Sequence, residues 1–472
     1  MSSTRTILES RPKVTGTRTK HAGDIGSVFA QFSGGTLPPH FAGLKRDLVP
    51  PEREAALVAS WRRLLTRLEY VTAEIQEKGS DLIPQVQFGD LDNLAPWVED
   101  EIRARGSVVV RGVTSEDWDT QLRSYVSSNP VTGFPKDDPQ VFEVYWSRAQ
   151  VGARAHPHVL KTQRWANRLY HAHEGAHVDL DTPVSYADRA RIRRPGDTSF
   201  ALGPHADGGS IELWEDKGYR ALYEAIFSGK WEDYDAYDAG LRDNTNSNLH
   251  DAIAHCGVTR TWQGWLALSN TGAGQGTLQV YPALREATAY VVLRPFFRPL
   301  LPPEVSGYLS AENWVLDLES AAFPGATLGK TLELSAATHP HLMLDKCMVP
   351  MRTVQPGDYV LWHCEGLHAV EELQGGERDS SVLYIAACPL TQRNAVHLRQ
   401  QRDCLERGGE SGPDFPAGAG EGDFVGRATA KDINGAEARR AMGLEPFDAA
   451  WGGTQGVRAL RRAANHVLFS RV

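Results

Sequence analysis

Two residues with metal-binding side chains, His205 and Asp207, lie two positions apart in the segment Gly203-Pro-His-Ala-Asp-Gly-Gly209. An apolar run precedes them, and side chains two apart on an extended chain point to the same side. The flanking glycines leave room for the backbone and a ligand to crowd a metal ion. An imidazole and a carboxylate suit iron(II), and a third protein ligand would complete one face of an octahedron and leave the opposite face open.

The His-x-Asp pattern is not specific by itself. The chain has 16 histidines, and a second example occurs at His177 and Asp179. Without a third ligand, a hydrogen-bonded pair at a turn explains either pair better than a metal site does. A metal site therefore requires a histidine or carboxylate from another part of the chain.

His368 is the candidate for that third ligand. It follows a turn, a strand and a second turn within residues 356–370, and it opens a further predicted strand. His363 in the same segment is the alternative. Arg378 lies ten positions after His368 and fifteen after His363, and the first spacing favours His368 as the ligand and His363 as a core histidine.

Arg378 and Ser380 are candidates for binding a cosubstrate. Strand alternation places them on one face with Val382 and Tyr384, an unusual position for an unpaired arginine on a barrel strand. An inward guanidinium requires a planar carboxylate, such as the distal one of 2-oxoglutarate, and Ser380 could donate a second hydrogen bond to it. The alternative is a salt bridge from Arg378 to a neighbouring glutamate.

Together these motifs resemble a known enzyme group. The His-x-Asp pair, the distal histidine after a G-D-x-V-x-W/F-H strand and the R-x-S pattern resemble the phytanoyl-CoA-hydroxylase-like branch of iron(II)/2-oxoglutarate oxygenases. Four stretches are similar to the YbiU-like family, and the likeness extends from about residue 50 to 450. Those stretches are residues 186–197, 202–210, 230–235 and 356–371.

The resemblance implies a double-stranded β-helix with the metal in its mouth. It implies that His205, Asp207 and His368 bind Fe(II), that 2-oxoglutarate chelates the metal and that O2 takes the last position. The glycine-rich turn and preceding strand of His205 and Asp207 match the family, whereas His177 lies in a charged, loop-like stretch. We therefore prefer the first pair.

The elements that must position these residues follow from the pattern of apolar residues. Residues 1–48 are polar and predict a flexible arm, and residues 49–106 have helical spacing and predict an N-terminal helical layer. We expect the oxygenase domain over 107–390, with an aromatic, helix-like insertion at about 212–256. Residues 391–472 predict a helical extension.

Short apolar runs between glycine- and proline-rich turns predict strands of an antiparallel barrel or sandwich. No phosphate-binding loop or dinucleotide fingerprint is present. With the resemblance, the expected fold is mainly β with flanking helices, a cupin-like jelly roll. The runs are residues 107–111, 198–202, 262–269, 277–281, 289–293, 359–362 and 381–386.

Arg191 and Arg193 share one face of a predicted strand and could bind a substrate carboxylate. Salt bridges to Asp188 or Asp197 are the equally plain alternative. Sequence alone does not choose between them.

The composition of the chain limits the classes of partner and the compartment that we expect for the protein. The net charge of −9, from 50 basic and 59 acidic residues, argues against nucleic acid, and no apolar run is long enough to span a membrane. Five cysteines without a C-x-x-C pair indicate a reducing compartment, which we take to be the cytoplasm. We expect a small-molecule substrate, and the sequence leaves the oligomeric state open.

The function expected is an iron(II)/2-oxoglutarate-dependent dioxygenase. The resemblance extends to a fungal oxygenase of secondary metabolism that forms an aziridine from L-valine. A JmjC-like protein hydroxylase is an alternative that would favour lysine in place of Arg378. A non-catalytic cupin-like binding protein and a zinc-dependent hydrolase are further alternatives, and the hydrolase would leave Arg378 without a role.

Overall fold

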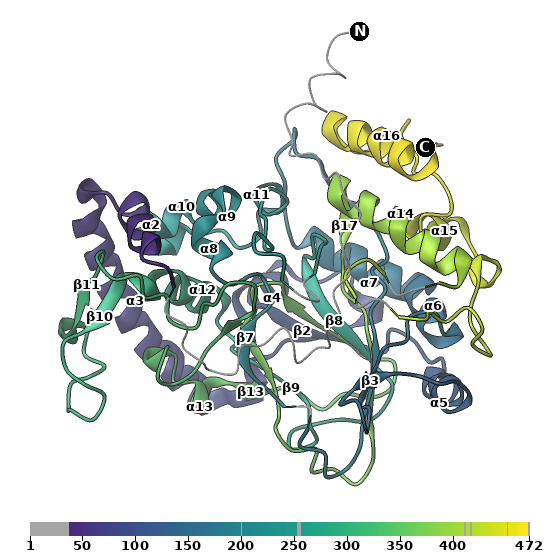
Figure 1. The fold of residues 1–472 in the computed structure, drawn as a ribbon, viewed down its shortest axis with the longest axis horizontal. Coiled ribbons are helices and arrows are strands. Elements are labelled where there is room, and N and C mark those ends of the chain that lie inside the picture. Colours follow the sequence, from purple (N-terminus) through teal and green to yellow (C-terminus); the bar gives the residue numbers. More distant parts are fainter. Residues whose placement is uncertain are drawn as a thin grey trace.

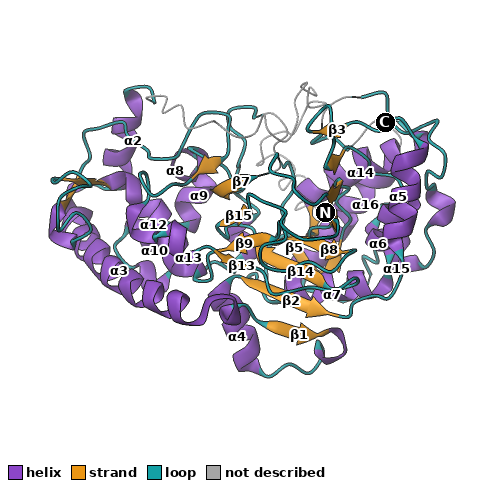
Figure 2. Ribbon diagram, turned by 90° about the horizontal axis from the view of Figure 1, so that it is seen from below, coloured by secondary structure: helices purple, strands orange, loops and turns teal. Residues whose placement is uncertain are grey.

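Two β-sheets occupy the middle of the molecule and helices flank them on both sides (Figures 1 and 2). The expectation of a sheet-rich fold with flanking helices is thus confirmed. The structure is a computed structural model of the chain. It describes residues 37–199, 201–252, 256–409, 412–415, 418–450 and 452–470.

The larger sheet has eight strands in the order β1-β2-β14-β8-β16-β6-β4-β3. Only the β1–β2 pair is parallel, and the other neighbours are antiparallel. The central strands β8 and β14 are buried at every position, so both of their faces are covered. The bounds are β1 Gln85–Gln87, β2 Ser107–Arg111, β14 Tyr359–His363, β8 Trp262–Ala267, β16 Ser380–Tyr384, β6 Ala190–Arg193, β4 Val141–Phe142 and β3 Gly133–Phe134.

The smaller sheet has five antiparallel strands in the order β12-β7-β15-β9-β13. Its central pair is β7 and β15, and the register places His205 directly opposite His368. Side chains of directly opposite residues in an antiparallel pair lie on the same face and close together. The bounds are β12 Leu332–Glu333, β7 Leu202–Ala206, β15 His368–Val370, β9 Leu278–Val280 and β13 Val349–Pro350.

Two N-terminal helices, α3 (Pro51–Lys78) and α4 (Pro96–Arg105), lie where the spacing predicts them. Each begins at a proline, which suits the first helical turn because no partner for its nitrogen is needed there. Helix α3 buries a stripe that includes Trp61, at three- and four-residue intervals. Gly106 then ends α4 with a positive φ of 67°, which permits the immediate turn into β2.

The prediction of a flexible arm over residues 1–48 is wrong for residues 37–48, the part of it that the structure describes. Residues His40–Leu48 form helix α2, which buries Phe41 and Leu44 against the core. Its apolar residues are few, and the buried Lys45 further obscures the pattern. Residues 1–36 lie outside the described part of the chain.

Short helices occupy the expected insertion, and residues 289–293 are helical as well. That run belongs to α12 (Leu284–Leu293), so the predicted strand is wrong there. A five-residue apolar run does not distinguish a buried strand from a buried helix, and α12 is buried along most of its length. The elements of the insertion are α8 Glu212–Glu215, α9 Lys217–Leu222, α10 Glu224–Phe227, η4 Trp231–Asp233 and α11 Ala239–Arg242.

Helices of the C-terminal part pack on the side of the sheets opposite α2 and α3 (Figure 1). Their apolar residues form a second core cluster together with residues of the segment 145–187, separate from the main one. The elements of this side are α5 Trp118–Ser128, α6 Arg148–Ala155, α7 Pro157–Arg168, β5 Val178–Pro183, β17 Pro389–Thr391, α14 Gln392–Arg407, η8 Ala430–Asp432, α15 Ala436–Ala441 and α16 Gln455–Phe469.

The remaining elements are short. They are η2 Gly79–Leu82, η3 Phe88–Asp90, η5 Arg294–Phe296, β10 Phe297–Pro299, η6 Ala311–Asn313, β11 Trp314–Leu316, η7 Pro340–Leu342 and α13 Leu344–Cys347. Within the described ranges, no helix is both long enough and apolar enough to cross a bilayer.

Candidate metal centre

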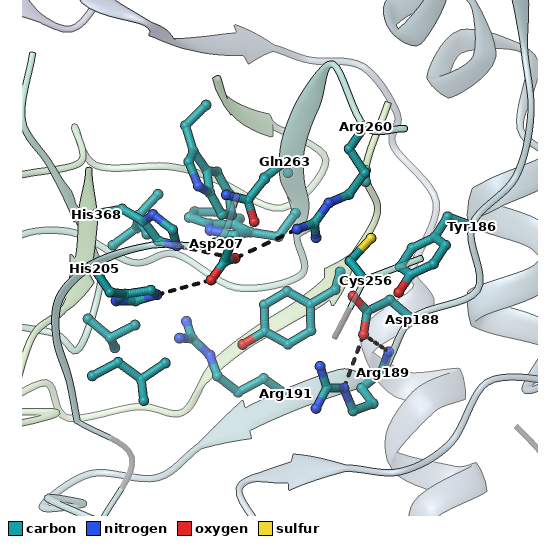
Figure 3. Close-up of a pocket in the computed structure, with 18 of the residues that line it drawn as sticks. Tyr186, Asp188, Arg189, Arg191, His205, Asp207, Cys256, Arg260, Gln263 and His368 are labelled. Carbon is teal, nitrogen blue, oxygen red and sulfur yellow. Dashed lines mark hydrogen bonds and ion pairs between the residues drawn. The ribbon is translucent and has the colours of Figure 1, made fainter. Parts of the chain in front are cut away.

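Three side chains that can bind a metal meet at the smaller sheet. Ligand atoms of His205, Asp207 and His368 all lie within 4.8 Å of one another. Nε2 of His205 is 3.5 Å from Oδ1 of Asp207, and Nε2 of His368 is 3.7 Å from Oδ2. Figure 3 shows both imidazoles turned toward the carboxylate. Elsewhere among the described residues, no other group of histidine, cysteine and acidic side chains meets this criterion.

Each imidazole is oriented by the same local bond. Nδ1 of His205 lies 2.7 Å from the carbonyl oxygen of Gly203, and Nδ1 of His368 lies 2.9 Å from that of Gly366. A carbonyl can only accept, so Nδ1 is the protonated nitrogen of each ring and Nε2 presents a lone pair. Both histidines therefore present the correct atom to a metal.

The donor set fits iron(II). Two neutral imidazoles and one carboxylate on a single face are the ligands that non-haem iron(II) oxygenases use. Burial lowers the pKa of His368 to about 3, and the adjacent His205 adds to the effect. His368 is therefore neutral at physiological pH, as coordination requires.

Asp207 is held by a second layer of polar groups from the larger sheet. In the amide orientation that satisfies both neighbours, Nε2 of Gln263 donates to Oδ2 of Asp207 (2.6 Å), and Oε1 accepts from Nε1 of Trp362 (3.0 Å). The Arg260 guanidinium is 3.9 Å from the same Oδ2. Both contacts are made to Oδ2, whereas Oδ1 faces Nε2 of His205.

A cavity of about 150 Å³ opens beside the triad, and both sheets line it (Figure 3). The larger sheet contributes Arg191 and Tyr384, and the smaller sheet contributes the apolar Leu202, Leu278 and Val370. Arg191 is only 3% exposed. A small anion with an apolar middle therefore matches the lining.

The structure does not bring Arg378 to this site. Its side chain is exposed, and it is absent from the residues that line the cavity. The predicted inward direction is wrong because β16 begins only at Ser380, so strand alternation does not reach Arg378. Ser380 is buried, but its hydroxyl accepts a hydrogen bond from Thr271 (3.1 Å) and does not line the cavity.

The two other predicted arginines have different positions. Arg191 lines the cavity. Arg193 is fully buried outside the lining, and it donates to the carbonyl oxygens of Glu371 and Glu372 and to Asp197. Because these acceptors use the N–H groups of the guanidinium, Arg193 links neighbouring backbone segments and has no free donor for a substrate.

Two residues of the alternative ligand sets, one histidine and one aspartate, are engaged in contacts elsewhere. Nδ1 of His363 accepts from the backbone of Glu365 (3.1 Å), and its Nε2 donates to the carbonyl oxygen of Ala236 (3.1 Å). Both of its nitrogens are therefore engaged. Asp179, of the alternative pair, forms an ion pair with Arg461 at 2.7 Å.

A buried cluster that no sequence pattern indicated supports the turn that precedes His368. The Glu365 carboxylate accepts from the hydroxyls of Tyr223 (2.6 Å) and Tyr234 (2.5 Å) and pairs with Arg242 (2.9 Å). Burial opposes ionisation of Glu365, but Arg242, His363 and the hydrogen bond from Tyr223 together outweigh it, and the pKa lies below its ordinary value. The insertion is thereby fixed to the turn that precedes His368.

Gln263 and Arg260 were also missed. The signal for Gln263 was a polar side chain in the otherwise apolar run Trp262–Ala267, since a buried polar group requires a partner. Arg260 carried no such signal, because it precedes the strand in a polar segment.

Comparisons with known proteins agree with this arrangement. A family model described as Gig2-like matches residues 35–444, which include all three ligand positions. YbiU of Escherichia coli K12 is 29% identical over 402 residues, which are 81% of this chain and 90% of YbiU. The expected relationship to YbiU is thereby confirmed.

Two crystal structures are similar along most of their length. One is GIG2, the product of GlcNAc-inducible gene 2 of Candida albicans, with 33% identity, 92% of this chain and 95% of that chain covered, and a TM-score of 0.83. The other is a candidate oxidoreductase of Salmonella typhimurium LT2, with 29% identity, 86% and 98% covered, and a TM-score of 0.72. With the family model spanning most of its length, the chain belongs to the Gig2-like family.

Proposed function

We propose that this protein is a non-haem iron(II) oxygenase that uses 2-oxoglutarate and O2 to oxidise a small molecule in the cytoplasm. The observation that carries the proposal is the convergence of His205, Asp207 and His368 beside a cavity that holds the buried Arg191. The similar Salmonella protein, described as a candidate oxidoreductase, supports the same class.

The cosubstrate site is assigned to Arg191 in place of Arg378. Arg191 lies on β6 within the cavity, next to the hydroxyl-bearing ring of Tyr384. A guanidinium binds a carboxylate through two parallel hydrogen bonds, so Arg191 would hold the distal carboxylate of 2-oxoglutarate. Leu202, Leu278 and Val370 would cover its methylene groups.

The protein's own contribution is orientation and exclusion of water. The Gly203 and Gly366 carbonyls fix the imidazoles, and Gln263 fixes the carboxylate of Asp207. Bound iron(II) would supply the open coordination positions at which 2-oxoglutarate and O2 react, giving succinate, CO2 and an oxidised substrate. The buried cavity limits the access of water to that reaction.

Two finer assignments belong to the same proposal. The two sheets that enclose the cavity would be the faces of a jelly roll, in the phytanoyl-CoA-hydroxylase-like branch. L-valine is the first substrate to test, with aziridine formation or hydroxylation as the expected outcomes and a role in secondary metabolism.

Succinate release tests the proposal. Anaerobically iron-loaded protein receives 2-oxoglutarate and O2, with and without a panel of amino acids that includes L-valine. We expect succinate from the wild type and none from His368→Ala. Arg191→Gln should need about 10- to 100-fold more 2-oxoglutarate, because a charged hydrogen-bonded pair is lost.

The matched control is Arg378→Gln, the same change at an exposed position, which should leave turnover and 2-oxoglutarate affinity unchanged. Folded protein that binds iron but releases no succinate would contradict the proposal and favour a cupin-like binding protein without catalysis.

A further inference from the structure

Arg260 is the one arginine lining the cavity whose positive charge is offset neither by a close ion pair with the protein nor by the proposed cosubstrate. Its side chain is 15% exposed and lines the cavity beside the triad. It donates no hydrogen bond to any residue that the structure describes, and its single ion pair there is the 3.9 Å contact with Asp207. The Asp207 carboxylate would bind the metal, so its negative charge would not offset that of Arg260.

The other two cavity arginines have partners. Nε of Arg189 is 3.1 Å from Oδ1 of Asp188, so these two charges offset each other. Arg191 lies on a different side of Asp207 from Arg260 (Figure 3). It is hydrogen-bonded to Tyr384 and is assigned to 2-oxoglutarate. By elimination, Arg260 remains for another ligand.

The charges of the cavity indicate what that ligand carries. Three arginines and two aspartates line it, which leaves one positive charge in excess. Iron(II) would add two positive charges, and 2-oxoglutarate, a dianion, would cancel them. One unit of positive charge then remains, and an uncompensated charge on a largely buried side chain such as that of Arg260 is costly.

The space beside Arg260 is also suitable for a second molecule. A smaller cavity of about 50 Å³ shares Asp207, Cys256 and Arg260 with the first. It continues past the triad toward the hydroxyl-bearing Thr245 and Ser247. Arg260 therefore lies where the two cavities meet, next to the proposed metal.

We propose that Arg260 binds the carboxylate of the primary substrate, which is therefore a small monocarboxylate. The inference rests on the proposed function, because it presumes that iron and 2-oxoglutarate fill the rest of the cavity. A carboxylate group accepts two parallel hydrogen bonds from a guanidinium, and its single negative charge offsets that of Arg260 locally, also where the molecule carries an ammonium group, as L-valine does. A phosphate monoester, with nearly two charges at neutral pH, would exceed the charge of Arg260.

Calorimetry on the zinc-loaded full chain tests the inference without turnover. With 2-oxoglutarate saturating, the protein is titrated with L-valine, L-serine and isobutyrate, each beside its carboxamide, and with inorganic phosphate. We expect at least one carboxylate to bind about tenfold or more tightly than its amide, in line with the strength of charged hydrogen bonds.

Variants assign that preference to a residue. Arg260→Gln should abolish the carboxylate preference while changing the 2-oxoglutarate dissociation constant less than about threefold. Arg260→Lys, which keeps the charge, should retain part of the preference. Arg378→Gln, exposed and remote from the cavity, should match the wild type in both titrations.

Three outcomes would overturn the inference: no carboxylate of the panel binds to the wild type, phosphate binds more tightly than every carboxylate, or Arg260→Gln keeps the preference. Loss of 2-oxoglutarate binding in Arg260→Gln would overturn it too, because Arg260 would then hold the cosubstrate. Failure of the wild type to bind 2-oxoglutarate at all would contradict the proposed function itself.

Discussion

Both histidines of the candidate metal centre share a Gly-x-His sequence in which the imidazole bonds back to the glycine carbonyl. His205 pairs with Gly203 and His368 with Gly366. The direction of each Nε2 atom is therefore set locally, within three residues. Asp207 is also held from outside its own turn, because Gln263 of the other sheet donates to its Oδ2.

That dependence predicts the effect of Gln263→Leu. The change removes the hydrogen bond to Oδ2 of Asp207 and leaves the indole nitrogen of Trp362 without its acceptor. Partners of metal ligands typically contribute 10- to 100-fold to metal affinity, so we expect iron(II) to bind about that much more weakly. Competition with a chromophoric chelator measures it.

Gln87→Leu on the exposed edge strand β1 is the control and should bind iron as the wild type does. An unchanged affinity in folded Gln263→Leu would show that Asp207 needs no support from the larger sheet.

At the scale of the elements, the contacts of the helical insertion were predicted least well from the sequence. Tyr223 between α9 and α10, Tyr234 directly after η4 and Arg242 of α11 reach the Glu365 carboxylate, between β14 and β15. Tyr219 of α9 also donates to the carbonyl oxygen of Gly208, beside Asp207. The insertion thus contacts both ligand-bearing turns.

Glu365→Ala tests how much this contact stabilises the fold. The change leaves the Arg242 guanidinium, 6% exposed, without its carboxylate. Removing one partner of a buried ion pair typically costs about 3–5 kcal/mol, and we expect a loss of that size in the free energy of unfolding measured in urea.

Glu232→Ala provides the comparison, because its ion pair with Arg63 is nearly half exposed on both sides. Exposed pairs contribute about 0–1 kcal/mol, so this variant should differ little from the wild type. Equal losses in the two variants would contradict a special role for Glu365.

For the whole molecule, buried histidines make stability depend on pH. Burial lowers the pKa of His363 to about 3 and that of His341 to about 4, against an ordinary value of 6.5. Below pH 6.5 the unfolded chain binds protons that the folded chain does not. The free energy of unfolding should therefore be level above pH 6.5 and fall as the pH decreases toward 3.

Urea unfolding between pH 7.5 and 5 measures this slope. We expect a loss on the order of 2 kcal/mol per histidine between pH 6.5 and 5. His341→Gln should reduce the slope, and His40→Gln, at an exposed position, should leave it unchanged. If the free energy of unfolding of the wild type did not change over this pH range, these imidazoles would not be buried in their neutral form.

Local patterns predicted the elements whose apolar spacing is long or repeated. Helix α3 and the strands β8 and β14 follow from such spacing. Helix α12 does not, because its apolar residues cover every face and lack a period. The short helices of the insertion also lack a periodic stripe, since each is only three to six residues long.

The sequence by itself singled out the three ligand candidates. His205 and Asp207 followed from a glycine-rich turn, which is a local property of the chain. His368 followed from its spacing to Arg378, although Arg378 lies outside the cavity. Only the tertiary structure decided which arginine faces the cavity. Arg191 and Arg378 are each near the end of a predicted strand, and their direction depends on where β6 and β16 begin. Strand ends are set by pairing with neighbours distant in the sequence, and so the cavity's charges became visible only after both sheets were in place.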